Sequence, residues 1–239
     1  MIYGKDVNER SPLRVFERSI HGGLGQGNIG LVMSRAGVGK TAFLVDVALD
    51  VCMRNDKVLH VDTEHTAQRV REYYEEVFRD LAHGTGLEDR ERVHFRVERN
   101  RMIHSFLRGS FSLERLQQAM IYMKEHIDFV PSCIILDGFP AWEQLSLQEL
   151  TESLAAVKKM AVESETEVWI SAQSHREDER DELGLPTRLN PYLDYLSVVV
   201  RLVSKGNQVR LQLVKDHENP DVADLHIELD PKTLLLKWR

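Results

Sequence analysis

Residues 34–41 read S-R-A-G-V-G-K-T, and this stretch decides the fold. It follows the apolar run I-G-L-V-M at 29–33 and leads directly into the amphipathic stretch 42–53. Glycines allow consecutive backbone N–H groups to face one anion, and a helix N-terminus adds the positive end of its dipole. The order of buried strand, glycine loop and helix therefore predicts a phosphate-binding loop.

Two side chains of this loop have expected roles. Lys40 is expected to reach the β- and γ-phosphates of a nucleotide, and Thr41 is expected to offer its hydroxyl to Mg²⁺. The strict pattern G-x-x-x-x-G-K-[ST] departs only at Ser34, where the pattern has glycine. A plain structural turn remains the alternative, but the strand before the loop and the helical period after it favour phosphate binding.

Length and composition favour one α/β domain. The 239 residues are 42% hydrophobic, which is enough for a large core, and neither an internal repeat nor a Pro- or Ser-rich linker interrupts the chain. We expect a single domain over 1–239. Residues 1–20 form its lead-in, and antiparallel strands occupy 197–239.

Charge and residue types restrict the class of protein further. The N-terminal sequence has no signal pattern, and no apolar run approaches the roughly 18 residues of a membrane span, so a cytoplasmic protein without membrane contact is expected. The net charge of −7 disfavours general attraction to nucleic acid. Cys52 and Cys133 are predicted to be buried free thiols. The histidines are dispersed without ligand spacing, so a metal site built from protein ligands alone is not expected.

Apolar periodicity predicts strands that alternate with helices. The predicted strands are 29–33, 57–62, 93–97, 133–137 and 167–172, and the predicted helices are 42–53, 65–82, 113–127 and one that starts at a capping box of Ser146 and Glu149. Short continuous apolar strands with helical crossovers are typical of a parallel sheet buried on both faces. After residue 196, the stretches 197–203, 208–215, 225–230 and 234–238 predict an antiparallel extension, with turns at 205–207 and 219–220.

Ligands bind at the carboxyl ends of strands in open α/β sheets. Asp137 closes an apolar strand and suits Mg²⁺ binding opposite Lys40 and Thr41. Glu64 follows the second strand, where it would polarise a water molecule for attack on the γ-phosphorus. Gln173 ends the 167–172 strand and would sense the γ-phosphate by hydrogen bonding.

Each of these residues has a plainer interpretation. An aspartate at a strand end, such as Asp137, is also common as a helix or turn cap. The presence of the phosphate loop favours Mg²⁺ binding for Asp137 instead. Glu64 is also consistent with a solvated carboxylate that stabilises the following helix through its dipole. Gln173 is also consistent with an ordinary loop amide. Lys215, which ends a later strand, is also consistent with a plain surface lysine.

Several segments together resemble the RecA-like ATPases, particularly the KaiC, RadA and DnaB branches. The resemblance rests on G-G-L-G-Q-G at 22–27, the phosphate loop, V-D-T-E-H at 61–65 and the strand at 133–137. It implies a RecA-like P-loop fold and ATP hydrolysis at subunit interfaces of a homo-oligomer, either a hexamer or a filament. Within this resemblance Glu64 corresponds to the catalytic glutamate, Asp137 to the Walker B carboxylate and Gln173 to the γ-phosphate sensor.

Lys215 lies near the lysine and arginine that such proteins insert into a neighbouring subunit's nucleotide site. His217 stands where an arginine is common in these proteins, and histidine would be a weaker, pH-dependent cation for contact with the neighbouring subunit's nucleotide. The expected catalytic residues are Glu64, Lys40 and Gln173. The expected metal ligands are Thr41 and Asp137. The residues expected to contact ATP are Ser34, Arg35, Ala36, Gly37, Val38, Gly39, Lys40, Thr41, Ala42 and Lys215.

The loops that would grip DNA in such a protein are acidic. Residues 138–157 contain no Lys or Arg, and residues 176–182 contain two basic and five acidic side chains. Since neutralised phosphates supply most non-specific DNA affinity, DNA translocation is disfavoured. The counterargument is the segment 90–108, in which arginines alternate with Phe95, His104 and Phe106 in the manner of single-strand binders. The alternation at 93–97 favours a half-buried strand with Arg92 and Arg96 on its solvated face.

The leading hypothesis is an ATPase that uses Mg²⁺ and ATP to control self-assembly or a protein partner. A DNA-dependent ATPase of recombination, repair or replication is the first alternative, and a nucleotide-binding scaffold without turnover is the second. A small-molecule kinase fits less well, because the acidic 176–182 loop does not resemble an arginine-rich lid. The loop F-P-A-W at 139–142 would contact a protein partner if exposed, although packing under the following helix is the favoured alternative.

Overall fold

The computed structural model describes residues 4, 9, 11–20, 22–106, 109–182, 184–206, 208–219, 221–222 and 225–238. Parts of the expected lead-in at 1–20, Arg108 of the basic segment, and the turn residues Asn207 and Pro220 lie outside the described residues.

One sheet runs through the described part of the chain, in the strand order β3-β2-β4-β5-β1-β6-β7-β8-β9. Its strands are β1 (Ile29–Ser34), β2 (Val58–Asp62), β3 (Arg101–Ser105), β4 (Cys133–Asp137), β5 (Glu167–Gln173), β6 (Val198–Lys205), β7 (Gln208–Asp216), β8 (Ile227–Leu229) and β9 (Leu236–Trp238). Neighbours from β3 to β6 pair in parallel, and neighbours from β6 to β9 pair antiparallel. The expected mostly parallel sheet with an antiparallel C-terminal extension is confirmed.

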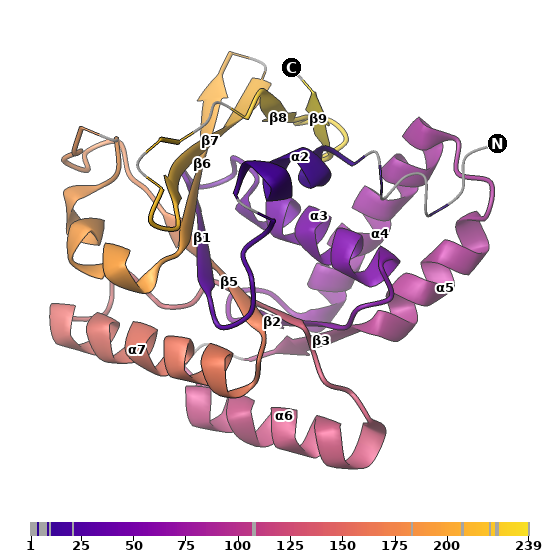
Figure 1. Cartoon of the computed structure of the whole chain (residues 1–239), viewed down its shortest axis with the longest axis horizontal. Coiled ribbons are helices and arrows are strands. Elements are labelled where there is room, and N and C mark those ends of the chain that lie inside the picture. The colour runs from indigo at the N-terminus through magenta and orange to yellow at the C-terminus, as the bar shows by residue number, and fades with distance from the viewer. Residues whose placement is uncertain are drawn as a thin grey trace.

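Helices cover both faces of this sheet (Figure 1). The helices are α2 (Pro12–Ser19), α3 (Lys40–Met53), α4 (Ala67–Thr85), α5 (Arg90–Asn100), α6 (Leu113–Ile127), α7 (Leu147–Glu163) and the 3₁₀ helix η1 (Thr187–Tyr195). One hydrophobic core joins α2, α3, α4 and α5 to the sheet, and a second joins α6, α7 and η1 to its other face. The parallel strands are buried on both sides as a result, which accounts for their continuous apolar sequences.

Side-chain caps set the starts of three helices. Thr66, Ser112 and Ser146 each accept a hydrogen bond from the backbone N–H three residues later, at the beginnings of α4, α6 and α7. The Ser146 N–H in turn donates to the Glu149 carboxylate at 2.8 Å, so the predicted capping box is confirmed. These caps satisfy N–H groups that a helix leaves unpaired at its first turn.

The predicted strand at 93–97 is wrong, because this stretch lies inside helix α5. Val93 and Val97 are four residues apart and both are buried, whereas Phe95 between them is 68% exposed. A strand would place all three on one face, while a helix turns Phe95 away from the core. The edge strand beside β2 is β3, which starts directly after α5.

Two other helices carry an exposed apolar residue at one end. Leu147 at the start of α7 is 64% exposed, and Ile127 at the end of α6 is 51% exposed. Both residues lie in the terminal turn of their helix, beyond the part that covers the sheet.

Cys52 and Cys133 are buried free thiols, as predicted. In the described part of the chain, every helix falls short of the length or the apolar character needed to cross a membrane.

Candidate functional site

The loop between β1 and α3 ends at a helix N-terminus that no side chain caps. Gly37 and Gly39 have φ of +72° and +124°, which side chains with a Cβ rarely adopt. Gly39 is the N-cap of α3, and no side chain caps that helix. Arg35, Ala36 and Gly37 are exposed at the tip of the loop, and Ala42 is buried in the helix. The uncapped helix N-terminus is therefore available to an anion, since its first N–H groups and its dipole both favour negative charge.

Thr41 and Asp137 meet across the carboxyl edge of the sheet. The Thr41 hydroxyl donates to Asp137 Oδ2 at 2.7 Å, and the Ser171 hydroxyl donates to Asp137 Oδ1 at 2.6 Å. Asp137 is only 4% exposed, so both carboxylate oxygens are held in place inside the protein. This pair supplies two hard oxygen donors of the kind that Mg²⁺ prefers.

Lys40 lies near the carboxylates of Asp137 and Glu64. Burial lowers the pKa of Lys40, whereas the negative charges of Asp137 and Glu64 raise it. The ammonium therefore sits in a partly desolvated position beside two acidic groups, at the mouth of the phosphate loop.

Glu64 lies beside Asp137, as its place after β2 predicts. Its backbone N–H donates to Asp62 Oδ1 at 2.7 Å. Gly138 follows Asp137, and a Cβ built there would lie 2.7 Å from Glu64 Cγ and 2.6 Å from Thr63 Oγ1. The Glu64 side chain thus packs against bare backbone, and its carboxylate is exposed at the carboxyl edge of the sheet. This position leaves it free to contact solvent near the phosphate loop.

Gln173 reaches the same edge through strand pairing. It is the register partner of Ser34 where β1 and β5 end, so it lies beside the start of the phosphate loop. Its backbone carbonyl accepts from Arg188 at 2.8 Å. Ser34 is 1% exposed, and its hydroxyl donates to the Arg35 carbonyl at 2.8 Å. The serine at the first loop position therefore stabilises the entry turn.

Lys215 does not lie at this edge within its own chain. β7 runs antiparallel to β6, and Lys215 pairs with Val199 near the start of β6. The amino end of β6 lies beside the amino end of β1, whereas the phosphate loop follows the carboxyl end of β1. Lys215 Nζ donates to the Leu193 carbonyl at 2.7 Å. Within one chain, this lysine and the phosphate loop therefore lie at opposite ends of the parallel strands.

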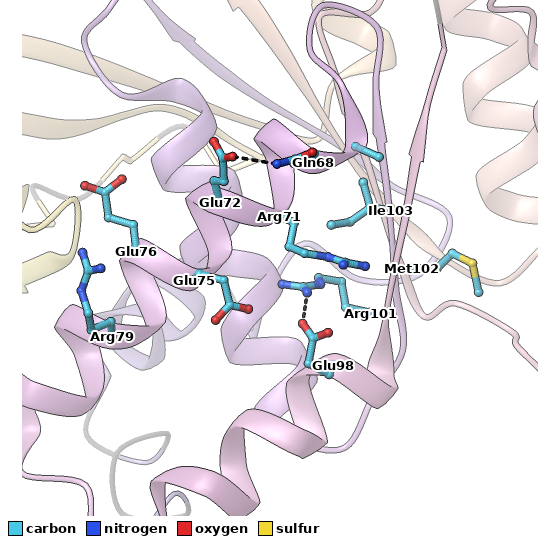
Figure 2. A pocket seen from close by; sticks show the side chains of 11 residues that line it. Gln68, Arg71, Glu72, Glu75, Glu76, Arg79, Glu98, Arg101, Met102 and Ile103 are labelled. Carbon is cyan, nitrogen blue, oxygen red and sulfur yellow. Dashed lines mark hydrogen bonds and ion pairs between the residues drawn. The ribbon is translucent and has the colours of Figure 1, made fainter.

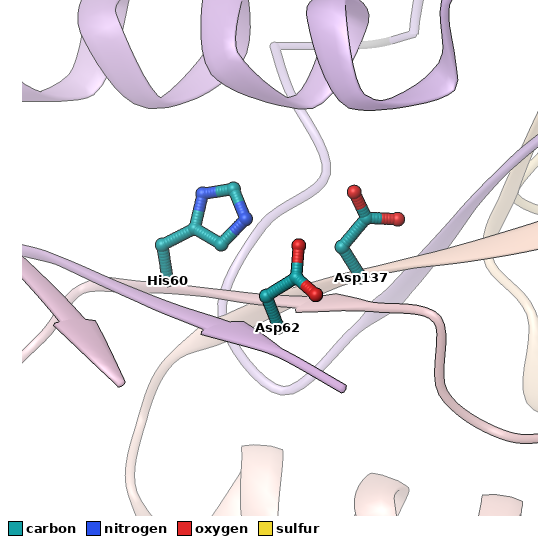
Figure 3. A group of neighbouring side chains, drawn as sticks. All are labelled: His60, Asp62 and Asp137. Atoms are coloured by element: carbon teal, nitrogen blue, oxygen red, sulfur yellow. The ribbon is translucent and has the colours of Figure 1, made fainter. Parts of the chain in front are cut away.

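Three polar residues near the site were not assigned roles from the sequence. Asp62 is the register partner of Asp137, and it accepts hydrogen bonds from the N–H groups of Glu64 and His65. Ser171 orients Asp137 from β5. His60 is fully buried two residues before Asp62, and the three groups His60, Asp62 and Asp137 lie together (Figure 3). Asp62 could have been recognised from the sequence, because it ends the apolar strand V-L-H-V-D at the edge where ligands bind. His60 could not, because the spacing of the histidines gives no sign of a shared site.

The basic segment is only partly available to a ligand. Arg96 donates to the Met53 carbonyl at 3.0 Å, and Arg101 lies over the Tyr74 ring and pairs with Glu98. Arg92 and Arg99 are exposed on α5, on the same side as Phe95. Two of the arginines thus have structural roles.

A cavity of about 960 Å³ lies between α4, α5 and β3, away from the phosphate loop (Figure 2). Glutamates and arginines alternate around it: Arg71, Glu72, Glu75, Glu76, Arg79, Glu98 and Arg101. Opposite charges already pair on its wall, as between Arg101 and Glu98. Because its charges are mixed, this cavity offers no concentrated positive field to a nucleotide or to DNA.

The loop at 139–142 packs inward. Trp142 Nε1 donates to the Ser171 carbonyl at 2.9 Å, and its ring meets that of Tyr192 at 6.0 Å between centroids. Phe139 packs against Phe111, with ring centroids 4.7 Å apart. These contacts favour the packing interpretation of this loop over an exposed partner surface.

Comparison with known proteins adds one family assignment. Residues 6–170, more than half of the chain, match the family model described as AAA domain. Among curated proteins, none matches the chain.

Proposed function

The chain belongs to the AAA domain family of P-loop NTPases, and from this premise we propose that it binds ATP with Mg²⁺ and hydrolyses the γ-phosphate. The observation that carries the proposal is the 2.7 Å hydrogen bond from the Thr41 hydroxyl to Asp137, beside Lys40 and an uncapped helix N-terminus. A phosphate group, a cation and its oxygen ligands would meet at this one point.

The phosphates of ATP would lie in the loop from Ser34 to Thr41. The N–H groups of this loop and of the first turn of α3 would donate to phosphate oxygens, and Gly37 and Gly39 permit the backbone to turn toward them. Lys40 would add a charge-assisted contact to the β- and γ-phosphates. Arg35, Ala36, Val38 and Ala42 contribute their backbone to the same cradle.

Thr41 and Asp137 suit a magnesium ion by their chemistry. Their oxygens are hard donors, and Ser171 holds the second oxygen of Asp137 at 2.6 Å. When bound, Mg²⁺ would neutralise charge on the β- and γ-phosphates.

Glu64 would polarise the attacking water. Its carboxylate is exposed at the edge where the γ-phosphate would lie, and Asp62 fixes its backbone. Gln173, beside Ser34 at the end of β5, would hydrogen-bond to the γ-phosphate and respond to its loss.

We also propose that ATP controls assembly of this protein with copies of itself or with a protein partner, as the likeness to RecA- and KaiC-like proteins suggests. The acidic stretches at 138–157 and 176–182 support this proposal over DNA translocation, because they would repel a phosphate backbone. In an oligomer, Lys215 and His217 would approach the nucleotide of a neighbouring subunit.

Turnover of ATP with Mg²⁺ by Glu64→Gln tests the catalytic assignment. Loss of a general base lowers turnover by about 10²–10⁴-fold while ATP still binds. Glu76→Gln, an exposed carboxylate on α4, serves as the control and should keep full turnover. Equal turnover in Glu64→Gln and the unmutated protein would remove Glu64 from the mechanism. ATP binding without turnover in the unmutated protein would favour the scaffold alternative.

A further inference from the structure

Three metal-ligating side chains converge beneath the carboxyl edge of the sheet, on the face that α3 and α4 cover. His60 and Asp62 are two residues apart on β2, so they point to the same face, and Asp62 is in register with Asp137 on β4. One ligand atom from each lies within 4.8 Å of the others. The exposed fractions are 0%, 0% and 4%, so the cluster is inside the protein.

His60 is held with one ring nitrogen directed at the two carboxylates. Its Nδ1 forms a 2.9 Å hydrogen bond with the Tyr74 hydroxyl, which fixes the ring. Its Nε2 is buried and has no hydrogen-bond partner among the described residues. Figure 3 shows the Nε2 edge of the ring facing Asp62 and Asp137. A buried polar atom without a partner is costly, so this nitrogen is poised to accept a ligand.

Surrounding groups hold both carboxylates in position. Asp62 Oδ1 accepts from the N–H groups of Glu64 and His65, and its Oδ2 is 3.0 Å from His65 Nδ1. Asp137 accepts from Thr41 and Ser171. Each carboxylate oxygen has two lone pairs, so these bonds leave capacity for a cation. They are the kind of outer contacts that orient metal ligands.

We propose that His60 Nε2, Asp62 and Asp137 bind a transition-metal dication of the Mn²⁺, Co²⁺ and Zn²⁺ class, at a position next to the Mg²⁺ that accompanies ATP. A nitrogen ligand separates this class from Mg²⁺, which prefers oxygen donors only. Three protein ligands leave a further position for water. Tetrahedral bonds of about 2.0–2.2 Å place ligand atoms about 3.3–3.6 Å apart, so the three ligand atoms, which lie within 4.8 Å of one another, would close in by up to about 1.5 Å when the ion binds.

Burial and charge favour such an ion. Two carboxylates within 4.8 Å repel each other in a medium of low dielectric, and a dication between them removes that repulsion. The site needs Asp137 but no nucleotide.

Cobalt titration of the full, nucleotide-free chain tests the proposal. Co²⁺ alone is added, and its visible absorption and stoichiometry are followed. His60→Phe should weaken Co²⁺ binding at least about 100-fold, because a direct ligand is worth more than the 10–100-fold of an outer contact. His94→Gln is the matched control, since His94 and two glutamates form the other cluster of ligand type in the described chain. It should bind Co²⁺ at the buried site unchanged.

Unchanged Co²⁺ binding in His60→Phe would overturn the proposal, as would loss of binding in His94→Gln alone. If His60→Phe does not fold, pulsed electron paramagnetic resonance of Mn²⁺ in His94→Gln decides. Coupling to nitrogen that changes when histidine carries ¹⁵N supports the site, and absence of nitrogen coupling overturns it. Binding of ATP with Mg²⁺, measured separately, shows whether the proposed nucleotide function stands or fails independently.

Discussion

Gly138→Ala should disable ATP hydrolysis without weakening ATP binding. Gly138 follows Asp137 with φ of +79°, and a Cβ there would lie 2.7 Å from Glu64 Cγ. Ordinary van der Waals contact begins near 3.4 Å, so the glutamate has to retreat by about 0.7 Å. Lys40 and the phosphate loop are not touched by the new methyl group in this geometry.

The size of the effect follows from that displacement. A misplacement of about 1 Å in a catalytic group costs on the order of 100-fold in rate, so kcat should fall by about 30–100-fold. The left-handed backbone adds about 1–2 kcal/mol of destabilisation when glycine is replaced. A drop in stability alone therefore has to be separated from a drop in catalysis.

Gly206→Ala provides that separation. Gly206 has φ of +61° in the turn after β6, and a Cβ there meets nothing within 4 Å. Both variants should lose the stability that a left-handed residue costs, but only Gly138→Ala should lose turnover at saturating ATP. Full kcat in folded Gly138→Ala would refute the placement of Glu64 as the group that polarises water.

Two further predictions concern stability. Burial raises the pKa of Glu167 to about 7, so its stabilising contribution is complete below pH 4.5 and is lost as pH rises through 7. Glu167→Gln should therefore gain about 1–3 kcal/mol relative to the unmutated protein at pH 8 and little at pH 5, and equal unfolding curves at pH 8 would disprove the charge argument. Trp142→Phe removes the 2.9 Å hydrogen bond to Ser171 and should cost about 1 kcal/mol, which urea unfolding measures. No loss of stability would place Trp142 outside the packed loop.

The parallel sheet was predictable because its strands are short, apolar and followed by helical periods. The phosphate loop indicated where β1 ends and α3 begins. Apolar runs predicted the strands that end at Asp62, Asp137 and Gln173. The stretch 93–97 misled because alternate apolar residues in a five-residue window fit a strand as well as one helical turn. Only burial of Val93 and Val97, with Phe95 outside, decides between them.

The residues of the candidate site could be predicted where a motif or the end of a single strand is enough to identify them. Thr41 and Asp137 needed only the motif and an apolar strand, and their side chains are joined by a 2.7 Å hydrogen bond. His60, Asp62 and Ser171 depend on which strands are neighbours and in what register, which the sequence alone does not supply. Lys215 depends on strand direction, because the carboxyl end of an antiparallel strand lies at the opposite edge of the sheet.

Equilibrium binding of ATP in the presence of Mg²⁺ to the unmutated chain and to Lys40→Ala tests the central claim most directly. A charge-assisted contact to phosphate is worth about 1.5–3 kcal/mol, so Lys40→Ala should weaken ATP binding by about 10–100-fold. Lys124→Ala on the exposed side of α6 should bind ATP like the unmutated chain. Equal affinity in Lys40→Ala, or no ATP binding by the unmutated chain, would contradict a phosphate site between β1 and α3.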